Sequence, residues 1–268
     1  MATTKTGTAP AGEVLQLAVR DRVAVVTIDR PELRNALNLD VIHGLVDLAE
    51  RIAGDPAIGA VVITGAGDHF CAGADISVAR GNEDEAKARW FIGEFQDAFR
   101  RFTGVPQPVI AAVEGCALGG GCELALWSDL RILSETARLG VPEVKIGALP
   151  AAGGTQLLPR IAGRGVALEL LLTGDPLAAE RAYQLGLASS VVPAGTALEE
   201  AVAMATRLAS LAPLALAAMK RAVDAAWLPL DQALEVERRL GAELFATDDR
   251  REGMAAFLEK RDPVFQGR

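Results

Sequence analysis

Short apolar runs rich in β-branched residues alternate with amphipathic stretches through the first half of the chain. Four of these runs predict buried strands, at 23–28 (VAVVTI), 60–64 (AVVIT), 108–113 (PVIAAV) and 130–133 (LRIL). Leu139 and the segment 144–146 predict a further extended pair. Short continuous apolar strands that alternate with helices are typical of a parallel sheet covered by helices. The first half of the chain is therefore predicted to be α/β.

Helices are predicted where apolar residues recur every three or four positions. One should begin at a cap supplied by Asn38 or Asp40, and another should run over 83–102. The aromatic residues of 83–102 are expected to lie in the core or along an apolar ligand pocket rather than around a cofactor. A short helix is predicted over 122–128, directly after a glycine-rich turn.

The helical pattern dominates after Thr155, and 197–258 is almost wholly helical, with Pro213 and Pro229 at predicted helix starts. We therefore divide the chain into three parts. These are a flexible N-terminal tail (1–12), a β-rich core that contains the active site (13–196) and a helical C-terminal region (197–268).

Composition excludes several classes of partner. The formal net charge is −8 and aromatic residues make up only 4% of the 268 residues, which disfavours binding to nucleic acid. No apolar run reaches the roughly 18 residues of a membrane span, and no targeting pattern is visible. The odd number of cysteines, three without CxxC spacing, predicts reduced thiols and a cytoplasmic location. His43 and His69 are far apart, so no metal site is predicted.

The chain has 35 acidic residues but only two histidines, so carboxylates and backbone amides are the expected catalytic groups. Two glycine-bearing segments stand out, 70–76 (FCAGADI) and 117–123 (ALGGGCE). The first is either a tight strand-to-helix turn capped by Asp75 or a loop that a ligand approaches closely. The second matches no phosphate-binding or nucleophile-elbow motif, which leaves a helix N-terminus with bare amides followed by a carboxylate.

Together these segments resemble the enoyl-CoA hydratase/isomerase (crotonase) family, and the enoyl-CoA hydratase branch in particular. The resemblance extends over nearly the whole chain. It is carried by 29–31 (DRP), 35–37 (NAL), 72–75 (AGAD), 108–113 (PVIAAV), 119–123 (GGGCE), 142–143 (PE), 153–156 (GGTQ) and 245–253 (FATDDRREG). It implies an α/β fold, a crotonase-like spiral of ββα units with a helical C-terminal trimerisation region. A homotrimer or a dimer of trimers is the implied assembly.

The resemblance also implies the chemistry. Glu123 and Glu143 match the two catalytic glutamates, and the backbone N–H groups of Ala74 and Gly120 match the oxyanion hole for a thioester carbonyl. The implied reaction is the reversible syn addition of water to a trans-2-enoyl-CoA, which gives a 3-hydroxyacyl-CoA. The acyl-CoA is the substrate, and neither a metal nor another cofactor is expected.

Further substrate contacts are expected in two places. Ala72, Gly73, Asp75 and Ile76 belong to the first glycine segment. In the C-terminal region we expect Phe257 and Lys260 to help close the coenzyme A site, on the same or a neighbouring subunit; the alternative is a core phenylalanine and a solvated lysine.

Two alternative functions remain at this stage, an enoyl-CoA isomerase and a non-catalytic RNA-binding protein of the same fold. The acidic charge disfavours RNA binding, and the pair of glutamates favours hydration over both alternatives.

Overall fold

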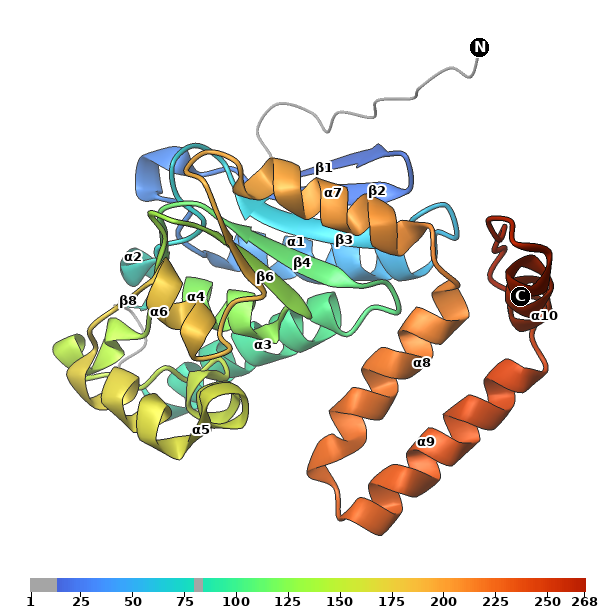
Figure 1. Cartoon of the computed structure of the whole chain (residues 1–268). Helices are drawn as coiled ribbons and strands as arrows, with labels where there is room; N and C mark the ends of the chain where they lie inside the picture. The colour runs from blue at the N-terminus through green and yellow to red at the C-terminus, as the bar shows by residue number, and fades with distance from the viewer. Residues whose placement is uncertain (1–13, 80–83) are drawn as a thin grey trace.

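A six-stranded sheet forms the centre of residues 14–79 and 84–268, the part of the chain that this computed structural model describes (Figure 1). The strand order is β1-β2-β3-β4-β6-β9. The strands are β1 (Leu15–Arg20), β2 (Val23–Ile28), β3 (Ala60–Gly65), β4 (Val109–Val113), β6 (Leu130–Ser134) and β9 (Ser190–Val192). All neighbouring pairs are parallel except β1 with β2. The parallel sheet is thus confirmed, while the predicted tail 1–12 lies outside the described residues.

Two features of the sheet differ from the sequence-based expectation. Strand β1 was not predicted, because of its six residues only Leu15 is buried and it pairs at the edge of the sheet. The segment 144–146, predicted to be extended, lies instead in the 3₁₀ helix η2 (Pro142–Ile146). The prediction was wrong because Pro142 occupies the first turn and favours a helical start, and Gly147 ends that turn with φ +71°.

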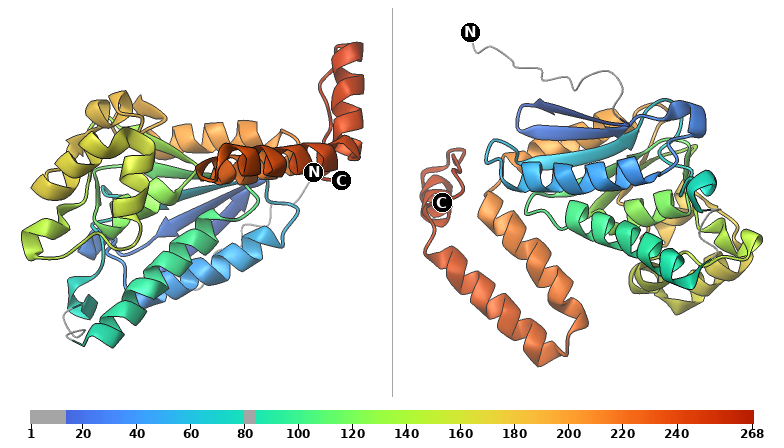
Figure 2. Two further views of the ribbon diagram at one scale, coloured as in Figure 1. Left: turned by 90° about the horizontal axis from the view of Figure 1, so that it is seen from below. Right: turned by 180° about the vertical axis from the view of Figure 1, so that it is seen from behind.

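Helices cover both faces of the sheet (Figure 2). On one face lie α1 (Leu39–Ala53) and α3 (Glu85–Thr103), and on the other lies α7 (Ala197–Ala209). Alternate residues of the strands face the two layers. In β3, Ile63 packs into the larger core under α1, and Val62 packs against alanines of α7. Both faces are buried, which explains the continuous apolar runs of the strands.

Caps confirm where the first helices begin. The side chain of Asn38, one of the two proposed caps, accepts a hydrogen bond from the backbone N–H of Val41 at 3.0 Å. Asp84 caps α3 in the same way. Three aromatic residues of α3, Phe95, Phe99 and Phe102, are buried in the core, whereas Phe91 is half-buried and Trp90 is exposed.

A second group of elements packs beside the sheet and carries the glycine segments. A small sheet has the order β5-β7-β8. The elements are η1 (Pro31–Leu33), α2 (Ile76–Ala79), β5 (Cys116–Leu118), α4 (Gly120–Trp127), β7 (Arg138–Gly140), α5 (Gly154–Thr173), β8 (Leu177–Ala178) and α6 (Ala179–Gln184). They bring segments that are far apart in the sequence to one end of the molecule (Figure 1).

The C-terminal helices extend away from the sheet (Figures 1 and 2). They are α8 (Pro213–Asp224), η3 (Ala225–Trp227), α9 (Leu230–Phe245) and α10 (Asp248–Glu259). Lys220 ties α8 to the core, because its Nζ lies 2.7 Å from Asp129 Oδ2 and donates to three backbone carbonyls that precede β4. The boundary between 196 and 197 stays a prediction; by packing, α7 lies with the sheet, and the departing helices begin at α8.

In the described part of the chain, no single helix has the length and apolarity to cross a membrane. One pair, Ala197–Ala209 with Pro213–Trp227, meets that criterion when joined, by length and composition only, and is bent by 109°.

Candidate active site

The two glycine segments meet backbone to backbone. Cys71 N–H donates to Cys116 O at 3.0 Å, and Leu118 N–H donates to Cys71 O at 2.9 Å. Gly73 has φ +107°, and a Cβ atom placed on it would lie 2.8 Å from Leu118 O and 3.4 Å from Gly120 N. Only glycine permits so close an approach.

This contact places the two predicted oxyanion amides side by side. A Cβ atom on Gly120 would lie 3.5 Å from Ala74 N. Leu37 N–H donates to Gly73 O and Leu37 O accepts from Asp75 N–H, so in this parallel bridge the N–H of Ala74 points away from Leu37. Gly120 is the first residue of α4, where N–H groups have no partner within the helix. No residue in 14–79 or 84–268 accepts a hydrogen bond from either N–H.

Glu123 lies in the first turn of α4 and is only 2% exposed. Its Oε1 accepts a hydrogen bond from Gly154 N–H at 2.8 Å, at the N-terminus of α5. Burial raises the pKa of Glu123 to about 7, and the charge of Glu143 acts in the same direction. The backbone groups of Gly154, Ala152 and Gly153 oppose this rise in pKa.

Glu143 approaches the same place from η2. A Cβ atom on Gly119 would lie 2.9 Å from Glu143 Oε1, so the glycine turn makes room for this carboxylate. Burial raises the pKa of Glu143. Its Oε2 is buried and accepts no hydrogen bond from the residues that the structure describes. The charge of Glu143 raises the pKa of Glu123, and an arrangement with one protonated and one ionised carboxyl group can supply both an acid and a base.

The first glycine segment supplies the other predicted substrate contacts near this pair. Ala72 and Gly73 lie in the loop itself, and Ile76, at the start of α2, is 69% exposed. The carboxylate of Asp75 is already occupied, since Oδ2 lies 2.9 Å from Arg30 and Oδ1 accepts from Ser77 Oγ at 2.6 Å. These contacts lower the pKa of Asp75, with Ser77 contributing most. The backbone N–H of Ser77 also donates to Asp75 Oδ1 at 3.1 Å, as expected of a residue that caps the turn, so both oxygens of this carboxylate have partners within the chain.

The two C-terminal residues do not join the cluster within one chain. Phe257 and Lys260 belong to α10 and its end, and α10 lies at the opposite end of the molecule from α4 in both figures of the fold (Figures 1 and 2). Phe257 is 83% exposed, so it is not a core residue of the single chain.

The three cysteines beside the site are free, and two of them are fully enclosed. Burial raises the pKa of Cys71 to about 12, and it raises the pKa of Cys122 well above that of an ordinary thiol. Thiols that hold their protons so firmly are poor nucleophiles, which agrees with a packing role. Among the described residues no group of three or more potential metal ligands occurs.

Sequence reasoning missed the groups that hold Glu123. The 153–156 segment contributed to the family resemblance, but its backbone contact with Glu123 was not foreseen. Trp127 was also missed, although it follows Glu123 by four residues on the same predicted helix, a spacing that places both side chains on one helix face.

Comparisons with known proteins agree with this geometry. The profile of the enoyl-CoA hydratase/isomerase family matches residues 19–268. A probable enoyl-CoA hydratase of Mycobacterium bovis is 44% identical over 94% of this chain and 98% of its own length. The crotonyl-CoA hydratase of Syntrophomonas wolfei is 42% identical over 94% of this chain and 98% of its own.

A solved structure of a relative has the same fold as this chain. The crystal structure of an enoyl-CoA hydratase from Bacillus anthracis superposes with a TM-score of 0.91 at 36% identity, and covers 95% of this chain and all of that one. The predicted crotonase-like α/β fold is confirmed. The chain belongs to the enoyl-CoA hydratase/isomerase family.

Proposed function

We propose that the chain catalyses the reversible syn addition of water to a trans-2-enoyl-CoA to give a 3-hydroxyacyl-CoA. The observation that carries this proposal is the buried Glu123 and the half-buried Glu143 beside the two free amides of Ala74 and Gly120. The relatives named enoyl-CoA hydratase and crotonyl-CoA hydratase, aligned over nearly the whole chain, support hydration and an enzyme of this type.

The amides stabilise the charge that develops on the substrate. Addition of water at C3 of the enoyl group moves negative charge onto the thioester oxygen. The N–H groups of Ala74 and Gly120 donate to that oxygen, and the loss of one such donor typically costs about 3–4 kcal/mol of transition-state stabilisation.

The carboxylates move the protons. Ionised Glu123 takes a proton from a water held between the two side chains, and the oxygen of that water bonds to C3 of the substrate. Protonated Glu143 gives its proton to C2, which restores the thioester carbonyl. The pair ends with its proton on Glu123, and transfer back to Glu143 through the next water closes the cycle. Burial raises the pKa of both carboxyl groups and so favours the bound proton that the mechanism needs.

Retention of both carboxylates favours a hydratase over an isomerase, since shifting a double bond needs no water between two acid–base groups. The −8 net charge disfavours the RNA-binding alternative. The mechanism needs no metal or redox cofactor, because the acid, the base and the oxyanion donors are all supplied by the chain.

The experiment is hydration of crotonyl-CoA by the Glu143→Gln variant. We expect kcat to fall by about 10² to 10⁴, the usual contribution of a positioned acid or base, with the fold unchanged. Glu169→Gln is the matched control, since Glu169 is exposed on α5. Near-normal turnover by Glu143→Gln would contradict the proposal, and double-bond migration without water uptake would favour the isomerase.

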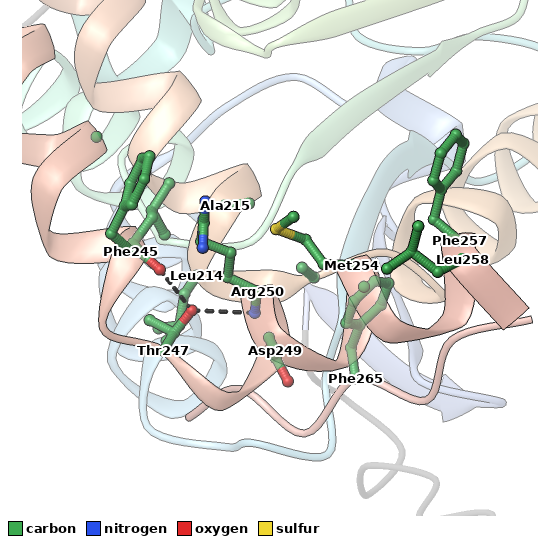
Figure 3. Close-up of a pocket in the computed structure, with 14 residues that line it drawn as sticks. Leu214, Ala215, Phe245, Thr247, Asp249, Arg250, Met254, Phe257, Leu258 and Phe265 are labelled. Atoms are coloured by element: carbon green, nitrogen blue, oxygen red, sulfur yellow. Dashed lines mark hydrogen bonds between the residues drawn. The ribbon is translucent and has the colours of Figure 1, made fainter.

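The C-terminal helices support a second part of the proposal, a homotrimer or a dimer of trimers. An apolar pocket of about 750 Å³ opens between α8, α9 and α10 (Figure 3). Phe245, Met254, Phe257 and Leu258 line it, and each is more than half exposed in the single chain. A neighbouring subunit that covers this surface removes the apolar area from water.

In that assembly Phe257 and Lys260 help to close the coenzyme A site of a neighbouring subunit. Their distance from Glu123 within one chain, together with the exposure of Phe257, supports this placement. Lys260→Ala should then weaken acyl-CoA affinity at low salt, and an unchanged affinity would contradict the role of Lys260. We also propose a cytoplasmic location, in keeping with the three free cysteines.

A further inference from the structure

Trp127 and Glu123 contact the same loop from one side of α4. Trp127 is the last residue of α4, and its Nε1 donates to Ala152 O at 2.8 Å. Glu123 lies one helical turn earlier and accepts from Gly154 N–H at 2.8 Å. Helix α4 therefore holds the loop 150–154 at two points, through a donor and an acceptor spaced four residues apart.

The loop is shaped to receive the indole. Gly153 has φ +131°, and a Cβ atom on it would lie 2.6 Å from Trp127 Nε1 and 3.1 Å from Cε2. A residue with a side chain at 153 would push the indole away from Ala152. A second side chain holds the adjacent carbonyl, because Gln96 of α3 donates to Ala151 O at 2.6 Å.

These contacts bear on Glu123 because the same loop presents its amides to the carboxylate. The backbone groups of Gly154, Ala152 and Gly153 all favour the ionised form of Glu123, against the effect of burial. Trp127 donates a hydrogen bond to the carbonyl of Ala152, which belongs to the same loop. This contact fixes the direction in which the following backbone N–H groups point.

We infer that Trp127 is a positioning residue for hydration: it holds the loop 150–154 so that Gly154 N–H stays on Glu123 and keeps that carboxylate oriented. This inference rests on the proposed function, since it assumes that Glu123 is the base. Trp127 itself is half-buried against the core and takes no part in proton transfer.

Trp127→Phe removes the N–H donor and keeps an aromatic ring. If the backbone amides of the loop bind Glu123 more weakly, its ionised form is less favoured. The pKa of Glu123 then rises, and its base form is populated only at higher pH. At pH 7 we expect kcat for crotonyl-CoA to fall about fivefold, because the loss of one hydrogen bond raises a pKa of about 7 by about one unit. The loss should shrink toward pH 9, and KM should change less than about twofold because the effect passes through Glu123.

The experiment compares the pH profiles of kcat for the wild type, Trp127→Phe and the matched control Trp227→Phe. Trp227 lies in η3, is 63% exposed, and stacks with Arg160. The inference predicts that the rising limb moves to higher pH in Trp127→Phe alone. If both variants share the wild-type profile, or if Trp127→Phe loses the same factor at every pH, the inference is overturned. If the wild type does not hydrate crotonyl-CoA, the proposed function fails instead.

An atomic substitution covers the case in which Trp127→Phe does not fold. In a Trp90→Phe, Trp227→Phe background Trp127 is the sole tryptophan of the chain. Replacing it with benzothienylalanine exchanges the indole N–H for sulfur at nearly constant shape. The same shift of the rising limb relative to the tryptophan-containing background supports the inference, and an unshifted limb overturns it.

Discussion

Helix α4 and the C-terminal helices differ in how much of their surface the single chain buries. Seven of the eight residues of α4 are buried, including Glu123. In the described part of the chain, α8 buries none of its 12 residues, α9 buries only Leu240, and α10 buries only Asp249 and Ala256. Most helical stability in proteins comes from packing. The single chain therefore completes the surroundings of α4 by itself, whereas α8–α10 leave an apolar surface exposed, which the proposed assembly would cover.

The difference also concerns charge. Near α4 the fold buries Glu123 and one oxygen of Glu143, Oε2, which accepts no hydrogen bond from the described residues, and this arrangement costs stability. In α10 the acidic groups are satisfied. Asp249 is buried but accepts from the backbone N–H groups of Gln266 and Gly267, and Glu252 pairs with Arg261 at the surface. The burial of acidic groups therefore lowers the stability of the fold near Glu123, whereas the acidic groups of α10 have partners that offset this cost.

The largest expected effect tests how much the burial of ionised Glu123 destabilises the fold. The pKa of Glu123 rises from 4.5 to about 7 on folding, so between these pH values the folded chain keeps a proton that the unfolded chain releases. The stabilising contribution is complete below pH 4.5 and is lost as pH rises through 7. A shift of this size corresponds to about 3 kcal/mol. Glu123→Gln cannot ionise, so it should be more stable than the wild type by up to about 3 kcal/mol at pH 8 and equal to it near pH 4.5.

Urea unfolding at pH 5 and pH 8, at one fixed protein concentration, measures this difference. Glu169→Gln is again the matched control and should give no pH-dependent gain, because Glu169 is exposed. A Glu123→Gln variant that is less stable than the wild type at pH 8 would show that the hydrogen bond from Gly154 outweighs the cost of burial.

The second effect tests how tightly the glycine turn is fitted. Gly119 has φ +53°, and a Cβ atom there would lie 2.9 Å from Glu143 Oε1. Gly119→Ala should displace Glu143 and lower kcat for crotonyl-CoA about 100-fold, about 2.7 kcal/mol, the usual result of moving a catalytic group by about 1 Å. Gly165→Ala is the control, because a Cβ atom on Gly165 meets nothing within 4 Å and alanine favours a helix. Equal activity of the two variants would mean that the turn at Gly119 accommodates a methyl group without displacing Glu143.

This comparison also explains which parts of the molecule could be predicted. The central strands and the start of α1 followed from local patterns, because apolar runs and the cap at Asn38 act over a few residues. Strand β1 has only one buried residue, and it pairs because β2 offers an edge. The formation of β1 depends on pairing with β2, and the residues of β1 alone do not show an apolar pattern that predicts this pairing.

The candidate site shows the same division. Glu123 and Glu143 were identified through the family resemblance, and no local rule connects two carboxylates 20 residues apart. The amide of Gly154 contacts Glu123 across 31 residues of sequence, and the indole of Trp127 contacts Ala152 across 25. They become visible only when the loop 150–154 is placed against α4.

The smallest expected effect is on the single chain at the C-terminal end. Leu258 is 77% exposed, so Leu258→Ser should change the free energy of unfolding of the dilute, unassembled chain by less than about 0.5 kcal/mol. Leu240 is 3% exposed, and Leu240→Ala should cost about 2 kcal/mol or more in the same measurement. At higher concentration Leu258→Ser should shift sedimentation toward smaller species, because the proposed assembly would bury Leu258 beside Phe257. If Leu258→Ser leaves sedimentation unchanged, this part of α10 faces solvent in the assembly, and the covered surface must lie on α8 and α9 instead.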